Sequence, residues 1–295
     1  MESWWQIGEV RVGKAVEMEA PLPGGGAGSM IPAAYPEAVA QMPWLVPDWA
    51  TQDGLLHLAV QAILVETPTS RLVVDTCVGN GKRRTSPLFD MLDTDFLEVF
   101  ETVSGWSVGD VDGVLCTHLH VDHVGWNTRL VDSRWVPTFP NARHYICREE
   151  MDHWVGSPEV GDARELLADS VQPLLDAGLV DLVTSDQQLF PEVALMATPG
   201  HTPGQFAVEI ESDGERAIIT GDLIHHPCQI GRPDWHSDFD TDAGQATDTR
   251  GAVLDAVADT STILIGTHFG GPTAGRVIRR GDGLELRAVE PSHGR

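Results

Sequence analysis

The pattern of apolar and polar positions predicts a mixed chain of short strands, helices and loops. Two β-prone runs, 55–66 and 71–75, are separated by Thr-Pro-Thr-Ser, which predicts a hairpin. Helical spacing of apolar residues predicts helices within 86–102, 148–154, 162–177 and 250–258. Further strands are expected at 6–18, 111–117, 142–147, 179–184, 193–197, 205–210, 216–220, 262–265 and 284–289. Strands and helices alternate along the chain, so the fold class is α/β.

The strands fall into two halves, roughly 1–150 and 180–295. We expect these halves to form two sheets with helices outside them. The chain of 295 residues, with 42% hydrophobic residues, is large enough for a substantial core. No repeat or low-complexity tract interrupts it, which favours a single domain over residues 1–295.

Charge and cysteine content narrow the range of partners. The formal net charge is −25, with 44 acidic and 19 basic residues, which disfavours nucleic acid and anionic membranes as partners. No stretch approaches 18 apolar residues, and the N-terminus lacks the pattern of a signal peptide. The four cysteines show no Cys-x-x-Cys spacing, which predicts free thiols in a cytoplasmic protein. Cys116, inside an apolar run, is expected to be a core residue rather than a metal ligand.

The segment 111–123 combines a buried strand with a loop rich in metal-ligand chemistry. Residues two apart in extended chain point the same way, so His118 and His120 can reach one ion. Asp122 and His123 follow where the chain must turn, and they can face a second ion. Imidazole and carboxylate are the ligands of zinc in hydrolytic sites. A polar loop with scattered histidines is the competing interpretation, but three His and one Asp within six residues favour a metal site.

Three more candidate ligands follow short apolar runs. His201 lies in Thr-Pro-Gly-His-Thr-Pro-Gly, Asp222 ends the run 216–220, and His268 follows 262–265. Sites of α/β folds gather at the edge of the sheet where strands end. We therefore expect these side chains to serve one site. The Gly-rich turn after Asp75 lacks the spacing of a phosphate-binding loop.

The pattern His-x-His-x-Asp-His at 118–123 resembles the motif of the metallo-β-lactamase fold superfamily, and the later His and Asp positions match it too. The resemblance implies a four-layer αββα sandwich and two divalent metal ions per chain. It implies zinc by ligand type, with manganese, iron or cobalt as alternatives. The implied ligands are His118, His120 and His201 for one ion, Asp122, His123 and His268 for the other, and Asp222 as the bridge. A hydroxide shared by the two ions would attack the substrate, Asp122 would also orient it, and Asp75 would support the metal loop.

Within this superfamily, the His/Asp set is similar to that of glyoxalase II, the acyl-homoserine lactonases and the methyl-parathion-hydrolase-like enzymes. In the lactonases, a tyrosine three residues beyond the bridging Asp contacts the substrate. His225 stands at that position here, and we expect it to donate a hydrogen bond to a carbonyl or leaving group. Trp126 and Trp235 follow the motifs closely, which favours an aromatic pocket wall. Trp44 and Trp49, in a Pro-rich loop, fit either a lid or packing beneath a loop.

These features predict a hydrolase for a small, neutral carboxylic ester or lactone with an apolar or aromatic group. A phosphotriesterase is the main alternative, because the same nucleophile can attack phosphorus. A thioesterase, a β-lactam hydrolase and a non-catalytic binding module of the same fold are further alternatives. A missing ligand would mark the binding module, and all the implied ligands are present. A homodimer is one option for the assembly.

Overall fold

Two large sheets organise the chain in the computed structural model, which describes residues 3–157 and 161–293. The chain divides into two compact units. Unit 1 comprises Met1–Glu17, Val60–Thr184 and Ser292–Arg295, and unit 2 comprises Met18–Ala59 and Ser185–Pro291. The expected division into N- and C-terminal halves is therefore wrong for 18–59, which cluster with the C-terminal part. The expectation of one domain over 1–295 stays a prediction.

The sheet of unit 1 is mixed, and two of its strands, β2 and β3, continue into unit 2. In spatial order its strands are β17 (Ser292–His293), β1 (Ser3–Ile7), β2 (Val10–Leu22), β3 (Leu56–Glu66), β4 (Arg71–Val74), β5 (Gly113–Cys116), β8 (Arg143–Cys147) and β9 (Val180–Val183). The strands β4, β5, β8 and β9 run parallel. Every residue of β5 is buried, as its continuous apolar sequence predicts. The loops after β4 and β5 therefore leave the sheet at the same edge.

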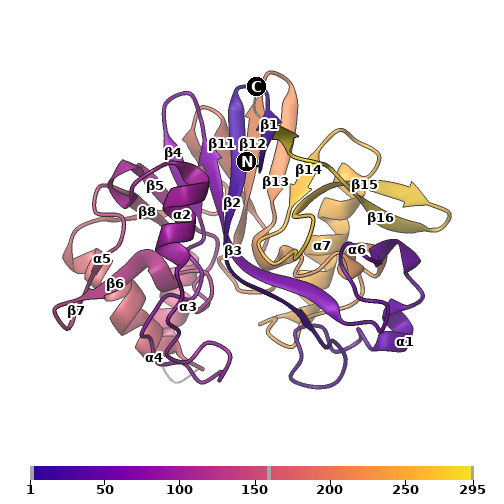
Figure 1. Ribbon diagram of the computed structural model, residues 1–295, viewed down its shortest axis with the longest axis horizontal. Coiled ribbons are helices and arrows are strands. Elements are labelled where there is room, and N and C mark those ends of the chain that lie inside the picture. Colours follow the sequence, from indigo (N-terminus) through magenta and orange to yellow (C-terminus); the bar gives the residue numbers. More distant parts are fainter. Residues whose placement is uncertain (1–2, 158–160, 294–295) are drawn as a thin grey trace. The chain divides into compact units, whose positions relative to one another are not determined.

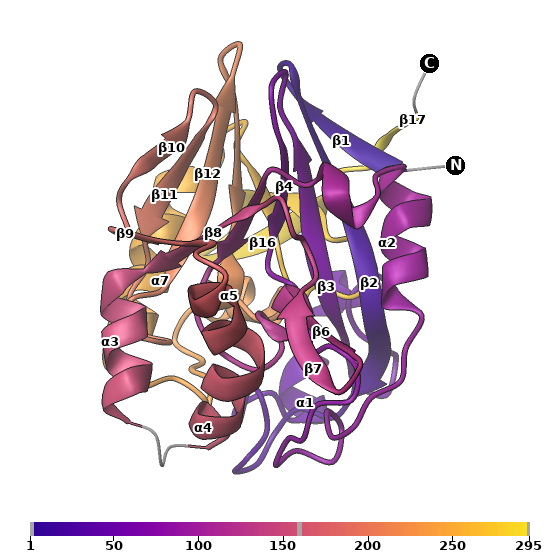
Figure 2. The same ribbon diagram turned by 90° about the vertical axis from the view of Figure 1, so that its left-hand side faces the viewer.

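Helices and a hairpin cover parts of unit 1. The helix α2 (Phe96–Ser104) buries positions four apart, Phe96, Phe100 and Ser104, and ends at Gly105 with φ 69°. Its two phenylalanines pack against Trp126 and Phe139. The remaining elements are α3 (Arg148–Gly156), α4 (Ala163–Leu166), a π-helical turn (Leu167–Val171), α5 (Gln172–Asp176) and the hairpin of β6 (Thr128–Val131) and β7 (Arg134–Pro137). The hairpin lies beside α5 (Figure 2).

Two buried cations share one carboxylate in unit 1. Asp169, in the π-helical turn, accepts hydrogen bonds from both terminal nitrogens of Arg84, at 2.8 and 2.9 Å. Lys82 Nζ lies 3.3 Å from the same carboxylate and also donates to Thr128 Oγ1 at 2.8 Å. The ammonium lies 3.9 Å from the ring centroid of Trp135. Burial lowers the pKa of Lys82 to about 8, against the attraction of Asp169.

The sheet of unit 2 consists mainly of hairpins. Its strands are, in spatial order, β10 (Gln188–Phe190), β11 (Val193–Ala197), β12 (Phe206–Ser212), β13 (Glu215–Ile219), β14 (Ile263–Ile265), β15 (Ala274–Arg280) and β16 (Gly283–Ala288). All neighbours are antiparallel except β13 and β14, which are parallel. The crossover between β13 and β14 contains η5 (Gly221–Leu223), α6 (Cys228–Gly231) and α7 (Ala243–Val257). Both α6 and α7 lie close to the sheet (Figure 1).

The core of unit 2 joins the segment 18–59 to the C-terminal sheet. Ile31, Leu45 and Trp49 are fully or almost fully buried in one cluster with Leu254 of α7 and Leu286 of β16. The segment also contains α1 (Pro36–Val39) and η1 (Pro43–Leu45). Trp49 donates a hydrogen bond to the carbonyl of Pro272 at 2.7 Å. For Trp49, packing beneath a loop is therefore the correct interpretation.

Most predicted elements are present, and the differences have local causes. The expected helix within 86–102 begins only at Phe96, because Met91 has φ 53° and the Thr94 amide donates to Asn80 Oδ1. The helix expected at 250–258 begins earlier, at Ala243, where Asp242 accepts from the Gln245 amide. The strand β15 was not predicted, because its exposed arginines obscure its alternation. In the part of the chain that the structure describes, no helix is long and apolar enough to cross a membrane.

Candidate metal centre

Four of the predicted metal-site residues lie on the loop that follows β5 in unit 1. Asp75 fixes the start of this loop: its carboxylate accepts from the amide and the hydroxyl of Thr117, both at 2.8 Å. The loop then turns, with the amide of His123 donating to the carbonyl of His120 at 3.1 Å. Leu119 is fully buried, and its amide donates to Glu150 Oε1 at 3.0 Å. These backbone contacts hold the histidines on either side of Leu119.

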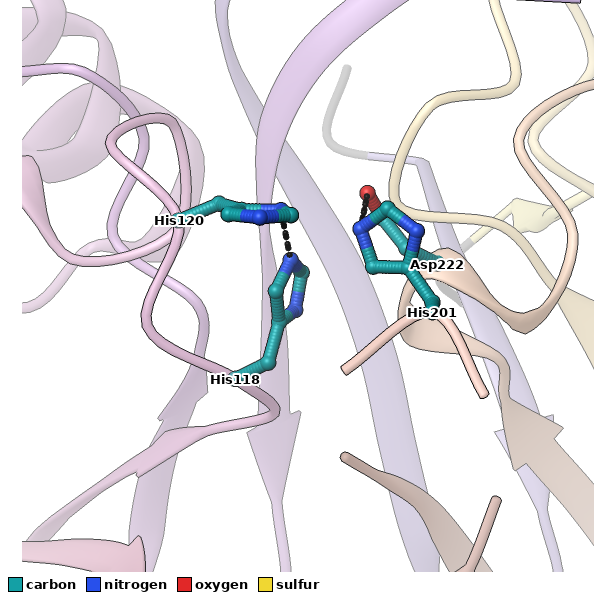
Figure 3. Close-up of side chains that lie close together, drawn as sticks. All are labelled: His118, His120, His201 and Asp222. Carbon is teal, nitrogen blue, oxygen red and sulfur yellow. Dashed lines mark hydrogen bonds and ion pairs between the residues drawn. The ribbon is translucent and has the colours of Figure 1, made fainter. Parts of the chain in front are cut away.

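His118 and His120 face each other. Nε2 of His118 lies 2.9 Å from Nδ1 of His120, and Figure 3 shows the two rings approaching through these atoms. Behind the first ring, Nδ1 of His118 lies 3.1 Å from the hydroxyl of Thr117. Trp154 packs edge-on against His120, with ring centroids 5.3 Å apart. Both side chains thus reach the same space, and their role as ligands of one ion stays a prediction.

Asp75 supports His123 from behind, as the sequence predicts. Nδ1 of His123 lies 2.8 Å from Asp75 Oδ2, and both side chains are only 1% exposed. On the other side of the ring, Nε2 lies 3.7 Å from Oδ1 of Asp122. The carboxylate thus fixes the orientation of the ring, with Nε2 on the side away from Asp75. Asp122 is 13% exposed, so it is in contact with solvent.

Glu17 supports the same loop indirectly, and the sequence analysis missed it. Its buried carboxylate accepts from the amide of Val78 at 2.7 Å and from Nε1 of Trp126 at 2.6 Å. Burial raises the pKa of Glu17, although these hydrogen bonds favour the ionised form. The turn that Glu17 binds lies against Gly125, where a Cβ atom would come within 1.7 Å of the Val78 carbonyl oxygen. Only glycine therefore allows the metal loop and this turn to approach so closely.

In unit 2, His201 lies in the tight turn between β11 and β12. Gly200 precedes it with φ 133°, and a Cβ atom there would lie 2.2 Å from the amide nitrogen of Ala246. The segment after α6 contacts this turn, since the amide of Thr241 donates to the carbonyl of His201 at 2.8 Å. His201 is 1% exposed. The Pro and Gly residues of the motif thus serve to bring this histidine close to a neighbouring backbone.

Asp222 stands between two histidines. It lies in η5, directly after Gly221, whose φ is 51°. Its Oδ2 is 3.3 Å from Nε2 of His201, a contact drawn in Figure 3, and its Oδ1 is 3.1 Å from Nε2 of His268. Nδ1 of His268 in turn lies 2.8 Å from the carbonyl of Ala59. Each oxygen of the carboxylate therefore faces a different imidazole.

His225 lies in the same group. Its Nε2 is 3.2 Å from Asp222 Oδ2, and its side chain is 1% exposed. The ring is parallel to that of His268, at an interplanar angle of 3° and a centroid distance of 6.0 Å. Burial lowers the pKa of His225, against the opposing charge of Asp222. The expected role of His225 in contacting substrate stays a prediction.

Asp240 is the second supporting residue that the sequence analysis missed. Its Oδ1 lies 2.8 Å from Nδ1 of His201, and its Oδ2 accepts from the amide of Ser237 at 2.9 Å. Burial opposes ionisation of Asp240, but its hydrogen bond with His201 and the nearby charges hold the pKa below its usual range. Atoms of His201, His225 and Asp240 lie within 4.8 Å of one another. No sequence pattern pairs Asp240 with a residue 39 positions away.

The spacing of the donor atoms fits metal ligation. Two donors about 2.1 Å from one ion are about 3.0 Å apart at a right angle and about 3.4 Å apart at the tetrahedral angle. The contacts of Asp222 with His201 and His268, at 3.3 and 3.1 Å, fall in this range. A supporting group behind Nδ1 of His201 and of His268 leaves the Nε2 atom of both rings available to a metal. The donor set, imidazole with carboxylate, is one that divalent ions such as zinc accept.

The four cysteines, and Trp126 and Trp235 from the sequence analysis, belong to the buried core. Burial raises the pKa of Cys116 to about 12, and its thiol contacts Asn127, so it is a core residue as expected. All four cysteines are free and buried. Trp126 and Trp235 are each only 4% exposed, which argues against the aromatic pocket wall predicted from them. Trp126 instead stacks on Phe96, and the backbone carbonyl of Trp235 accepts a hydrogen bond from the guanidinium of Arg250.

Comparisons with known proteins agree with this arrangement. Residues 57–268 match the family model described as Metallo-beta-lactamase superfamily. An N-acyl homoserine lactonase from Bacillus cereus is 27% identical over 181 residues, which is 57% of this chain and 65% of the relative. A probable metallo-hydrolase from Bacillus subtilis (strain 168) is 28% identical over 122 residues, 38% of this chain and 44% of the relative. The matched part thus spans less than two thirds of these relatives' own length.

Solved structures resemble the chain over nearly its whole length. AidC, described as a dizinc quorum-quenching lactonase in complex with a product, has a TM-score of 0.78 at 23% identity, with 98% of both chains covered. The hydrolase AbOPH in the beta lactamase superfamily has a TM-score of 0.77 at 21% identity and covers 100% of this chain and 99% of its own. These likenesses confirm the fold class expected from the sequence.

Proposed function

The chain belongs to the metallo-beta-lactamase superfamily, and we propose that it is a dinuclear metal-dependent hydrolase that cleaves a neutral lactone or carboxylic ester. The observation that supports this most directly is the environment of Asp222. Each of its carboxylate oxygens faces the Nε2 of a different histidine at the spacing of two ligands on one ion. One carboxylate in this position suits two ions.

The proposed ligands are the seven residues that the family motif indicates. His118, His120 and His201 would hold one ion, Asp122, His123 and His268 the other, and Asp222 both. Bound there, two divalent ions supply an activated water molecule at neutral pH and a Lewis acid for the substrate oxygen. We propose zinc, with manganese, iron or cobalt as alternatives for the same donors.

The remaining chemistry belongs to side chains of the protein. Asp122 is partly exposed and ionisable, so it is suited to accept a hydrogen bond from the attacking water and to orient it. Asp75 and Asp240 would keep the rings of His123 and His201 in one orientation throughout the reaction. Such fixed donors need not reorganise as charge develops on the substrate.

Two observations favour a neutral carbonyl substrate. Six relatives that match 57% of the chain are N-acyl homoserine lactonases, whose name specifies a lactone. The net charge of −25 repels anionic substrates and is indifferent to neutral ones. The proposed substrate is therefore a small, neutral lactone or ester.

The test is a comparison of kcat/KM for the metal-loaded chain. The panel contains acyl-homoserine lactones, an aryl ester, a neutral phosphotriester, a thioester and a β-lactam. We expect the lactones or the ester to be the best substrates. A phosphotriester preference above about tenfold, equivalent to about 1.4 kcal/mol, would contradict the proposal and support a phosphotriesterase. Binding of two ions without hydrolysis of any substrate would support the non-catalytic module instead.

A further inference from the structure

His225 lies among the donor atoms of unit 2. A residue that only contacts the substrate, as the sequence analysis expects of His225, would not need this position. Its Nε2 lies 3.2 Å from Asp222 Oδ2, and Nε2 of His201 lies 3.3 Å from the same oxygen. The two histidines therefore have the same relation to this oxygen. By the spacing argument that identifies His201 as a ligand, His225 also qualifies.

The burial of His225 gives a second, independent observation. The side chain is 1% exposed, and within residues 3–157 and 161–293 neither ring nitrogen has a hydrogen-bond partner of good geometry. An imidazole buried without partners loses the hydrogen bonds that water would provide, which is costly. A metal ion would satisfy Nε2, whose 3.2 Å contact with Asp222 lacks the geometry of a hydrogen bond, whereas a transient substrate would leave this nitrogen unsatisfied in the resting enzyme.

The backbone around His225 holds the ring in this position. Its amide donates to Oε1 of Gln229 at 2.8 Å, and the Nε2 of Gln229 donates to the carbonyl of Trp235 at 2.9 Å. The next residue, His226, is also buried but has other partners: its Nε2 lies 2.8 Å from the Trp49 carbonyl, and its Nδ1 lies 3.0 Å from the Cys228 amide. The two adjacent histidines thus differ, since the ring nitrogens of His226 contact backbone groups and those of His225 do not.

We propose that His225 is a metal ligand, which binds through Nε2 the same ion as His201 and Asp222 Oδ2. This inference rests on the proposed dinuclear site and adds one protein donor to it. The three side chains form a set of two imidazoles and one carboxylate within unit 2. An additional donor raises the number of protein ligands on this ion above that of a three-ligand catalytic zinc site.

The experiment compares metal binding by the wild type and two variants under competition with a chelator. His225→Leu fills the buried space without a donor, and His225→Gln keeps a hydrogen-bond donor but is a weaker ligand. Loss of one metal contact should weaken the affinity for one ion by at least about 10–100-fold. At a chelator concentration where the wild type keeps two ions, both variants should keep one. With cobalt(II), visible absorption should change in both variants, because one ion has lost a donor.

His236 provides a matched control, because it lies in the loop of the same crossover and is exposed. His236→Ala should bind both ions with unchanged affinity. Unchanged affinity in both His225 variants, with a fall in kcat/KM for the Leu variant and recovery for the Gln variant, would overturn the proposal and restore the substrate contact. If the wild type binds two ions but hydrolyses no lactone or ester, the proposed reaction fails while weakened binding in the variants still supports the ligand assignment. Thermal unfolding of all variants in excess chelator checks that each is folded.

Discussion

Asp240 and His201 are joined by a 2.8 Å contact between Oδ1 and Nδ1, although 39 positions separate them in the sequence. The same relation occurs in unit 1, where Asp75 Oδ2 lies 2.8 Å from Nδ1 of His123. In both pairs the carboxylate is also fixed by a backbone amide, from Ser237 or from Thr117. A carboxylate in this position orients an imidazole and raises its basicity as a ligand.

For Asp240, we expect Asp240→Ala to weaken the binding of one ion by about 10–100-fold, with a smaller effect for Asp240→Asn, which keeps an acceptor but loses the charge. Isothermal titration with zinc or manganese measures the affinity. Asp238→Asn is the control, since Asp238 lies in the same loop, is exposed and accepts from the Gly28 amide. Equal affinities for Asp240→Ala and the wild type would show that Asp240 does not support a ligand.

The number of bound ions is a separate prediction. Seven residues match the ligand motif, enough donors for two ions, so we expect two ions per chain at saturation, measured by elemental analysis after removal of free metal. Incubation with a strong chelator should abolish hydrolysis, and two equivalents of metal should restore it. A plateau at one ion per chain would contradict a dinuclear site.

Asp222 should be essential for both ions, because its two oxygens face different histidines. Asp222→Ala is expected to remove hydrolysis and to lower the metal content below two. Asp222→Asn keeps the shape of the side chain but loses its negative charge, so it should bind metal poorly. Metal content and kcat/KM are measured on the same preparations. Wild-type turnover in either variant would mean that Asp222 is not the bridge.

Lys82 gives a prediction about stability and pH. The pKa of its buried ammonium is about 8 in the folded chain, against 10.5 as the ordinary value. Between these values the unfolded chain binds more protons than the folded chain, so this group makes the free energy of unfolding rise with pH. The rise is at most about 1.4 kcal/mol per pH unit. Below pH 8 both states are protonated, and the contribution is constant.

Urea denaturation of the wild type and Lys82→Met between pH 7 and 10 tests this sign. The free energy of unfolding of the wild type, minus that of the variant, should be flat near pH 7 and increase above pH 8. Subtracting the variant removes the contributions of the other titrating groups. A difference that falls with pH would mean that the ammonium is stabilised in the folded state.

The metal loop could be predicted because its chemistry is local. Four candidate ligands lie within residues 118–123, and a buried strand precedes them. The hydrophobic pattern and the residue types were therefore sufficient to predict the metal loop. His201, Asp222 and His268 followed from their places after apolar runs and from the family motif. The structure then showed that His201 and His268 both contact Asp222.

The supporting carboxylates could not be predicted in the same way. Glu17 lies 61 residues from the amide of Val78 that it binds, and nothing in either segment distinguishes it from a surface glutamate. Asp240 is one of several acidic residues in its segment. The burial of Trp126 and Trp235 also depends on distant partners, which is why proximity to the motifs misled the prediction. Contacts of this kind depend on tertiary packing that no local pattern encodes.

The division of each unit into separate chain segments has a consequence for biosynthesis. The core of unit 2 contains Ile31 near the beginning of the chain and Leu286 near its end. During synthesis, the apolar side chains of Ile31 and its neighbours therefore stay exposed until β16 has been made. Long-range contacts of this kind slow folding and expose surfaces that aggregate. The nascent protein is expected to depend on chaperones during this interval, and C-terminal truncation before β16 should yield insoluble chains.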